Sequence, residues 1–367
     1  MISKVDTKII QVITSPCGGG AEVLVRELAS KVGDGFYASK AVFFNNNAAC
    51  ASNLILNRNE STLNVSFRNP FSILKLRKLF IRELTECKSL IVHSHLTWPF
   101  IYVPFAASGL NVILFYTEHG TTNWRRRFKL LKFFDRFIYA KYDSIICISS
   151  GVEESLQFWL GQNSAKEPIE LVYNGANFYG YKQRSQLSKK INFISVGSLF
   201  PTKGFDRAIS ALAHLKEYDW HYTIVGTGPM LIELKALASS LGLDGKVTFF
   251  GWSDNISELF YASNIQLIPS RWEGFGLVAV EGMSTGLPII GSNIKGLNEV
   301  LIGKHSSFLV NNPDDHLEWI EKIELCIKSL EVSVDLVARD ALATSEMFSL
   351  DRMVKSYNEL YIKNIGS

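Results

Sequence analysis

The sequence of 367 residues has little cysteine, and its cysteines follow no recognisable spacing. The five cysteines stand singly, their number is odd, and no two have Cys-x-x-Cys spacing. This argues against a disulfide framework and against structural zinc, and it favours free thiols in a reducing cytoplasm. The stretch from Met1 to Lys8 is charged and lacks a long apolar core, so we expect no export signal. The cysteines are Cys17, Cys50, Cys87, Cys147 and Cys326.

An excess of one charge is also absent, since the formal net charge is only +3. A protein that holds duplex DNA through its overall charge carries much more, and no nucleic-acid partner is expected. Hydrophobic residues make up 47% of the chain and charged residues 20%. These fractions are typical of folded globular proteins and exclude a disordered or fibrous chain.

A long uninterrupted hydrophobic helix is lacking too. Residues 96–117 carry no charge and would be long enough to span a membrane. Pro99, Pro104 and Gly109 divide this stretch into a short helix, a turn and a strand that starts near Val112. We therefore expect no membrane span here.

Short apolar runs rich in β-branched residues recur along the whole chain and alternate with helical patterns. Fully apolar strands separated by helices indicate parallel sheets covered on both faces. Eleven such strands are too many for one ordinary domain, and 367 residues suit two domains. The predicted strands are residues 9–14, 41–44, 90–93, 112–116, 144–148, 169–172, 192–196, 222–225, 247–249, 265–268 and 288–291.

The predicted fold is α/β, with two doubly wound parallel-sheet (Rossmann-like) domains. The composition becomes polar at residues 181–190, directly before the strand 192–196, and we place the boundary there. The domains are then residues 1–180 and 181–349, with the last helix, 350–367, joining the first domain. Ligands of such sheets bind beyond the carboxyl ends of the strands, so chemistry is expected in the loops that follow them.

Two of these loops suit a phosphate. Gly18, Gly19 and Gly20 allow a close backbone approach just before a helix N-terminus, but they lack the pattern of a dinucleotide fingerprint and the lysine of a P-loop. Lys203 lies just before an amphipathic helix and can neutralise a phosphate oxygen. The alternatives are a tight turn for the glycines and an ordinary surface lysine for Lys203.

The third loop carries two carboxylates, Glu273 before a helix and Glu281 within it. Eight residues are a little over two helical turns. Because Glu273 lies before the helix and Glu281 within it, both can face one cleft from different backbone segments. A glutamate on the apolar helix that begins at Leu277 is costly to bury without hydrogen-bond donors, and sugar hydroxyls would serve. A structural salt bridge is the alternative.

These segments resemble retaining glycosyltransferases of the GT-B fold, the group 1 or family 4 type, along nearly the whole chain. The resemblance implies an acceptor-binding first domain, a nucleotide-sugar-binding second domain, and a reaction in the cleft between them. The matching segments, in chain order, are Gly18–Gly20, Thr117–Gly120, Tyr173–Gly175, Lys203–Gly204, Gly226–Pro229, Glu273–Glu281 and Gly286–Pro288.

The resemblance also implies roles for single residues. His119 would lie near the donor sugar and the reacting centre, although by itself it reads as an ordinary loop histidine. One departure is Ser198, where relatives usually have an arginine that contacts phosphate; Arg271 and Arg207 are the candidates to compensate. The catalytic residues implied are His119, Lys203 and Glu273. The donor-binding set is Lys203, Gly19 and Gly20 on the diphosphate, Ser198 in place of the usual arginine, Glu273 on the sugar, Glu281 on the ribose, the amides of Gly274, Phe275 and Gly276, and Trp252 in the base-binding loop.

The implied reaction retains the anomeric configuration and needs no metal or other cofactor. The donor is a nucleotide sugar, UDP rather than GDP by family frequency, that carries a hexose or N-acetylhexosamine. The acceptor is a saccharide, which in this family is typically linked to polyprenyl diphosphate, in bacterial O-antigen, capsule or exopolysaccharide synthesis. Two alternatives are a nucleotide-sugar epimerase and a catalytically silent sugar-nucleotide-binding partner. His93 and His95 share a strand face, but no cysteine or carboxylate completes a metal site.

Basic charge gathers in residues 123–142, which hold seven basic residues against one acidic residue. Interleaved aromatic and aliphatic residues make this a basic amphipathic helix, suited to an anionic membrane surface or a lipid diphosphate. The protein would then be cytoplasmic and peripheral on the inner face of the cell membrane. The alternative is a sheet-covering helix with a solvated basic face. The residues assigned to the membrane or acceptor are Arg125, Arg126, Arg127 and Lys129.

Overall fold

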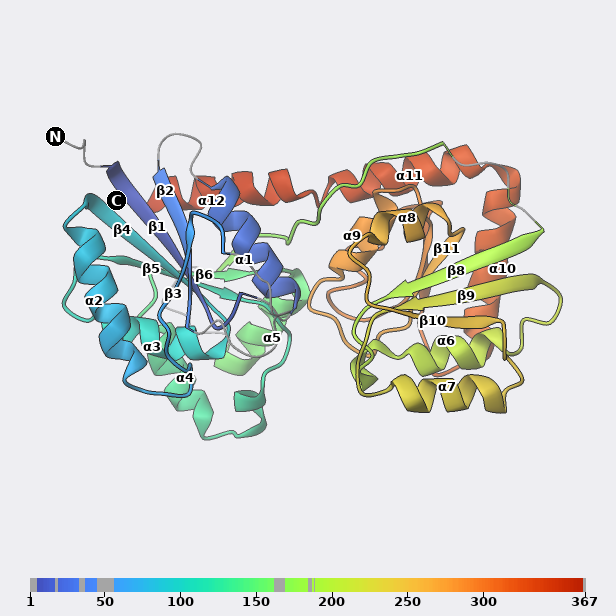
Figure 1. The fold of residues 1–367 in the computed structure, drawn as a ribbon, viewed down its shortest axis with the longest axis horizontal. Helices are drawn as coiled ribbons and strands as arrows, with labels where there is room; N and C mark the ends of the chain where they lie inside the picture. Colours follow the sequence, from blue (N-terminus) through green and yellow to red (C-terminus); the bar gives the residue numbers. More distant parts are fainter. Residues whose placement is uncertain are drawn as a thin grey trace. The chain divides into compact units, whose positions relative to one another are not determined.

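A computed structural model describes residues 5–16, 19–32, 37–44, 56–161, 169–183, 187 and 189–365 (Figure 1). The chain divides into two compact units. The first unit is Met1–Tyr173 with Asp351–Ser367, and the second unit is Asn174–Leu350. The division falls a few residues before the polar stretch in which we expected it.

The first unit is built on a parallel sheet with the strand order β3-β2-β1-β4-β5-β6-β7. The strands are β1 (Val5–Ile13), β2 (Tyr37–Phe43), β3 (Glu60–Thr62), β4 (Cys87–His95), β5 (Ile113–Glu118), β6 (Ser144–Cys147) and β7 (Ile169–Leu171). The helices are α1 (Gly20–Lys31), α2 (Ser72–Leu84), α3 (Thr97–Ala107), the 3-10 helix η1 (Trp124–Arg127), α4 (Leu131–Tyr139), α5 (Ser150–Leu160) and α12 (Leu350–Ile365).

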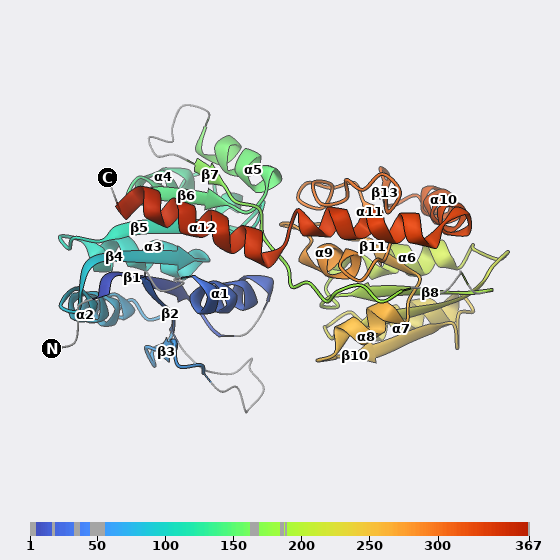
Figure 2. The ribbon, with the colours of Figure 1, turned by 90° about the horizontal axis from the view of Figure 1, so that it is seen from above.

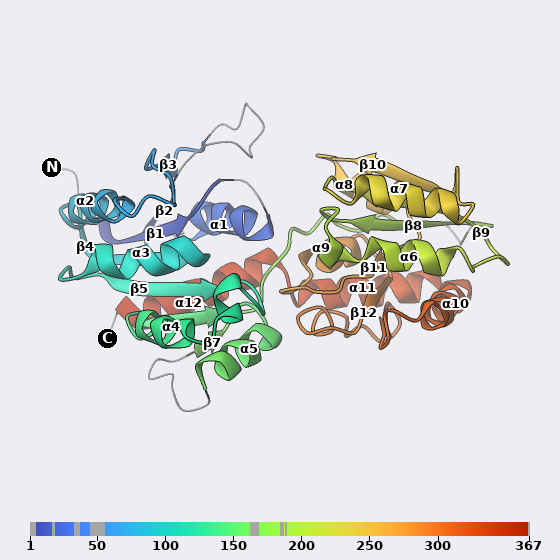
Figure 3. The ribbon, with the colours of Figure 1, turned by 90° about the horizontal axis from the view of Figure 1, so that it is seen from below.

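Helices cover both faces of this sheet. From above, α12 lies over the sheet (Figure 2), and from below α3 lies over it (Figure 3). Alternate residues of β4 serve the two faces, because side chains of a strand point to opposite sides. His93 contacts Tyr361 of α12, whereas the hydroxyl of Ser94 donates to Tyr142 on the other face. The polar residues of this central strand are therefore buried with partners on both sides.

The uncharged stretch 96–117 forms α3, a turn and β5, which confirms the sequence prediction. Pro104 lies inside α3. Leu96, directly before α3, has the positive φ of 65° that L-residues rarely adopt. No helix within the described ranges is both long and apolar enough to cross a membrane.

The second unit has a parallel sheet with the order β10-β9-β8-β11-β12-β13. Each of the eleven predicted strands overlaps a strand of the structure, while β3 and β13 were not predicted. The strands are β8 (Lys190–Val196), β9 (Asp219–Val225), β10 (Val247–Gly251), β11 (Ile265–Ile268), β12 (Ile289–Ser292) and β13 (Ser307–Val310). The helices are the 3-10 helix η2 (Pro201–Lys203), α6 (Phe205–Leu212), α7 (Leu231–Ser240), α8 (Ile256–Tyr261), α9 (Leu277–Met283), α10 (His316–Val332) and α11 (Val334–Glu346).

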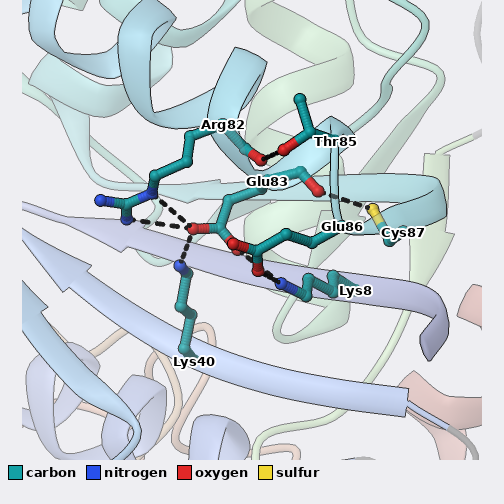
Figure 4. A network of polar contacts seen from close by, with 7 residues as sticks. All are labelled: Lys8, Lys40, Arg82, Glu83, Thr85, Glu86 and Cys87. Carbon is teal, nitrogen blue, oxygen red and sulfur yellow. Dashed lines mark hydrogen bonds and ion pairs between the residues drawn. The ribbon is translucent and has the colours of Figure 1, made fainter. Parts of the chain in front are cut away.

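A charged cluster joins α2 to the strands of the first sheet (Figure 4). The buried carboxylate of Glu83 lies 3.0 Å from Lys8 Nζ, 2.6 Å from Lys40 Nζ and 3.1 Å from Arg82 Nη2. Burial alone would raise the pKa of Glu83, but the hydrogen bonds from Lys40 and Lys8 outweigh it and lower the pKa to about 2. Every charge in the cluster has a partner, since Lys8 also contacts Glu86. The cluster therefore stabilises the sheet and offers no vacant charge to a ligand.

Candidate active site

Lys203 is held at the carboxyl end of the second sheet by the turn that contains it. The chain leaves β8 at Val196, forms η2, and enters α6 through Gly204, which has a φ of 62°. A Cβ atom at Gly204 would lie 2.1 Å from the carbonyl oxygen of Pro269, just after β11. Only glycine fits there. The close contact brings Lys203 beside the loop that follows β11.

Glu273 lies in that loop and meets Lys203. The Lys203 Nζ atom is 2.6 Å from Glu273 Oε1, and the Ser270 hydroxyl donates to the same oxygen at 2.8 Å. The Glu273 residue is only 8% exposed. A buried carboxylate needs a cation and donors of this kind. The structure thus brings together two residues that lie seventy positions apart and that the sequence assigned to one site.

The carboxyl group of Glu281, unlike that of Glu273, has no cation beside it in the part of the chain that the structure describes. Glu281 lies on α9, and burial raises the pKa of its carboxyl to about 7. The pKa of Tyr179 is also raised, mainly by burial and further by the nearby charge of Glu281. Within the described residues no hydrogen bond or ion pair satisfies the Glu281 carboxylate. The salt-bridge alternative therefore describes Glu273, and Glu281 remains available to hydroxyl donors.

The two arginines considered as substitutes for the missing charge at Ser198 are both engaged. Arg271 forms two hydrogen bonds to the carboxylate of Asp206, at 2.7 and 2.6 Å. Arg207 Nε lies 2.7 Å from Asp314 Oδ1. Ser198 itself is exposed. A phosphate bound near Ser198 would rely on Lys203 unless one of these arginines left its carboxylate partner. The role of Ser198 itself stays a prediction.

The remaining donor-site residues of the second unit lie on loops at the same edge. Trp252 follows β10, its side chain is 74% exposed, and its Nε1 donates to Asp254 at 3.1 Å. Gly276 precedes α9 with a φ of 89°. Gly274 and the buried Phe275 complete the turn between Glu273 and α9. Their contacts to a sugar nucleotide stay predictions.

The glycine loop of the first unit is only partly described, because Gly18 lies outside the described residues. Gly19 caps α1, and its amide donates to Glu22 Oε2 at 3.0 Å. The N-terminal end of α1, which begins at Gly20, therefore already faces a carboxylate. Burial raises the pKa of Glu22. A phosphate at Gly19 and Gly20 would have to displace this side chain, a competitor that the glycine pattern did not reveal.

His119 follows β5 and lies beside the end of β4. Its Nε2 is 3.0 Å from His95 Nδ1, and burial lowers the pKa of His119 to about 4. The ring is therefore neutral at pH 7. Both ring nitrogens of His93 have hydrogen-bond partners, Tyr361 and Thr117. Among the described residues, no three histidine, cysteine or acidic side chains are grouped as metal ligands.

The prediction for Arg125 and Arg126 was wrong. Residues 123–142 do not form one helix, because η1 and α4 are separate. Arg125 is 1% exposed, and its Nε donates to Asp135 at 2.9 Å. Arg126 lies 3.2 Å from Glu118 and donates to the carbonyl of Thr121. Helical periodicity did not reveal that two of the three consecutive arginines turn inward to acidic partners.

The rest of this segment is exposed. Arg127 and Lys129 are exposed, which both the membrane prediction and the alternative of a solvated basic face require. Large apolar side chains accompany them, and we call this set the basic apolar surface. It consists of Arg127 and Lys129 with Trp124, Phe128, Leu130, Phe133 and Phe137, whose exposed fractions run from 49% to 83%.

Two family models match consecutive parts of the chain. The model described as Glycosyltransferase Family 4 matches residues 18–178, and the model described as Glycosyl transferases group 1 matches residues 181–339. The chain belongs to the group 1 glycosyltransferases. The group 1 or family 4 membership expected from the sequence motifs is confirmed, and so is the GT-B fold. Retention of configuration stays a prediction.

Individual relatives and solved structures are similar to this chain over most of its length. An uncharacterized glycosyltransferase of Methanocaldococcus jannaschii is 27% identical over 74% of each chain. The UDP-Gal:alpha-D-GlcNAc-diphosphoundecaprenol alpha-1,3-galactosyltransferase of Escherichia coli is 28% identical over 66% of this chain and 67% of its own. The structure of Anabaena HepE in complex with UDP and glucose has a TM-score of 0.79 at 18% identity, covering 97% of this chain and 99% of that one.

Proposed function

We propose that this glycosyltransferase transfers a hexose or N-acetylhexosamine from a UDP-sugar to a saccharide acceptor with retention of configuration. The pairing of Lys203 with Glu273 at the carboxyl ends of β8 and β11 supports this most directly, because it joins a cation for phosphate to a carboxylate for hydroxyls. The acceptor we propose is linked to polyprenyl diphosphate, in surface polysaccharide synthesis. The Escherichia coli relative, whose name specifies such an acceptor, supports this choice.

The proposed chemistry is electrostatic. The acceptor hydroxyl attacks the anomeric carbon on the face from which the diphosphate leaves, and a departing phosphate oxygen takes the proton. The Lys203 ammonium exchanges Glu273 for the diphosphate and stabilises the charge that develops on it. Glu273, released from Lys203, accepts hydrogen bonds from sugar hydroxyls. No metal ion is needed in this scheme.

The first test is thermal stabilisation of the full chain by UDP, GDP and ADP, each with a chelator. A ligand at 100 times its dissociation constant adds about 2.7 kcal/mol to the stability of the protein that binds it. We expect a shift with UDP, followed by transfer from a UDP-sugar to a lipid-linked saccharide extract. Binding without any transfer would favour a silent binding partner. Inversion at C2 of the sugar without an acceptor would favour an epimerase.

The raised pKa of Glu281 predicts a pH dependence of UDP binding. The ribose hydroxyls bind the ionised carboxylate, so affinity falls as pH drops through about 7 and the group protonates. For one group with this pKa, the dissociation constant is about tenfold larger at pH 6 than at pH 8. Calorimetry with UDP at both pH values measures this ratio.

Glu281→Gln provides the control, because the phosphate of UDP also titrates near pH 6. The amide does not ionise, so only the contribution of the nucleotide remains in this variant. We expect weaker binding and a smaller pH ratio than in the wild type. An equal pH ratio in both proteins would remove Glu281 from the ribose site.

The basic apolar surface suits an anionic membrane that carries the proposed lipid-linked acceptor. Its cations attract anionic headgroups, and its aromatic rings can enter the interface between headgroups and acyl chains. Each cation near such a surface contributes about 1 kcal/mol, so Arg127→Ser with Lys129→Ser should weaken binding to phosphatidylglycerol vesicles about thirtyfold. Vesicle sedimentation at low salt measures this.

Arg339→Ser is the matched control, since Arg339 is an exposed arginine of the second unit. It should leave vesicle binding unchanged. Phe133→Ser tests the apolar part, because the Phe133 ring is 68% exposed. If neither the double variant nor Phe133→Ser loses affinity, this surface does not bind the membrane.

A further inference from the structure

A chain of hydrogen bonds runs from α12 through the first sheet to His119. The Tyr361 hydroxyl lies 3.0 Å from Gln11 Nε2 and 2.6 Å from His93 Nδ1. The Gln11 Oε1 atom is 2.8 Å from His95 Nε2, and His95 Nδ1 is 3.0 Å from His119 Nε2. Tyr361, Gln11, His93 and His95 each have an exposed fraction of 0%. Their hydrogen bonds therefore depend on one another and not on solvent.

The direction of these hydrogen bonds follows from the number of protons available. The amide nitrogen of Gln11 can only donate, so the Tyr361 oxygen accepts from it and gives its single proton to His93 Nδ1. Burial lowers the pKa of His93, so the ring is neutral and its proton is on Nε2. That proton is donated to Thr117 Oγ1, 2.7 Å away. Tyr357, also on α12, lies 3.2 Å from Thr117 Oγ1.

The carbonyl oxygen of the Gln11 side chain determines which ring nitrogen of His95 carries the proton. A carbonyl oxygen only accepts, so His95 Nε2 must carry a proton toward Gln11. Burial lowers the pKa of His95 well below its usual value, and a neutral ring has one proton. His95 Nδ1 is therefore an acceptor, and it takes the proton of His119 Nε2. The lone pair of His119 Nδ1 is then left without a donor among the described residues.

The backbone supports this arrangement. Leu96, directly after His95, has φ 65° and ψ 175°. A residue other than glycine rarely adopts such a conformation, which persists only where its surroundings enforce it. The rings of His93 and His95 lie 4.2 Å apart, and the Tyr361 ring packs against Phe115 at 5.2 Å. The packing thus holds the His95 ring in place at a strained bend.

We propose that Tyr361, acting through Gln11 and His95, is a positioning residue that fixes the tautomer of His119, so that His119 Nδ1 accepts a hydrogen bond from a hydroxyl of the bound saccharide. His119 acts in this way as an acceptor and not as a proton donor or a cation. The identity of the saccharide rests on the proposed function. The tautomer of His119 does not, because it follows from contacts within the first unit.

The tautomer can be measured on the full chain without a ligand. Nitrogen-15 NMR of histidine-labelled protein should show His119 protonated on Nε2 and unprotonated on Nδ1, with the signal assigned by its loss in His119→Gln. In Tyr361→Phe, the Gln11 amide loses its acceptor and can turn round. The bond between the two histidines then reverses, and a new signal with protonated Nδ1 should appear. A wild-type His119 protonated on Nδ1, or an unchanged signal in Tyr361→Phe, overturns the proposal.

Two variants of His95 connect the tautomer to turnover. His95→Leu removes the acceptor of the His119 proton, so kcat should fall about tenfold or more while the Kd for UDP stays unchanged. His95→Asn places an acceptor oxygen near the former Nδ1 position and should restore most of kcat. Equal losses in both variants would show that packing alone matters, and would overturn the positioning role. Absence of transfer by the wild type would refute the proposed function but would leave the NMR result intact.

Discussion

Lys203→Ala should lower the turnover of sugar transfer about 100- to 1000-fold. This range is typical for removal of one group that stabilises charge developing in a transition state. Lys203 pairs with Glu273, whereas Arg207 and Arg271 pair with Asp314 and Asp206. In our proposal Lys203 exchanges its partner for the diphosphate and the two arginines keep theirs. The measurement is the initial rate of nucleotide release at saturating donor and acceptor.

Lys182→Ala is the matched control for this experiment. Lys182 is an exposed lysine of the same unit and pairs with Glu258, so its loss should leave turnover unchanged. Lys203→Arg keeps the charge but not the compact ammonium, and should recover only part of the rate. Near wild-type turnover in Lys203→Ala would mean that an arginine exchanges its partner for the diphosphate, and the proposed role of Lys203 would be withdrawn.

Arg125→Ala should destabilise the protein by about 3–5 kcal/mol, the usual cost of removing one partner of a buried ion pair. Asp135 is fully buried, and among the described residues it would keep only the hydrogen bond from Trp159 Nε1, at 3.0 Å. Arg125 also donates to Thr97 and lies over the ring of Phe100. Urea unfolding of the full chain should show the loss in the transition of the first unit.

Arg127→Ala is the control, because the neighbouring Arg127 is exposed and its loss should change stability by no more than about 0.5 kcal/mol. The double variant Arg125→Met with Asp135→Leu should recover much of the stability, since a buried ion pair can be replaced by apolar side chains. If Arg125→Ala keeps full stability and loses vesicle binding, Arg125 belongs to the membrane surface after all.

The sequence predicted the secondary structure where local signals are strong. The eleven predicted strands are present because continuous β-branched runs suit a sheet covered on both faces. The strands β3 and β13 were missed: β3 spans only Glu60–Thr62, and no residue of β13 except Val310 is fully buried. Short or half-buried strands depend on pairing with a neighbour, and that pairing leaves little trace in their own residues.

Some residues of the first and second units were identified from the sequence as site candidates, and others were not. Glycine loops, Lys203 and the two glutamates stand at fixed places relative to strands and helices, so local signals located these loops, and the family resemblance that they carry implied a sugar-nucleotide site. Gln11 and Tyr361 carried no such signal, because their hydrogen-bond partners lie far away in the chain. A buried glutamine and a helix tyrosine look like ordinary core residues until the fold brings them together.

The sequence by itself therefore determined the two-sheet α/β architecture, the family, and the candidate residues in the loops that follow the strands. Tertiary structure alone decided which charges and hydrogen-bond donors pair within the protein. Arg125 pairs with Asp135, Arg271 pairs with Asp206, and the Gly19 amide donates to Glu22. The physical reason is that periodicity and glycine spacing report local backbone geometry and burial. The partner of a buried charge is chosen by distances between atoms that only the folded chain brings close.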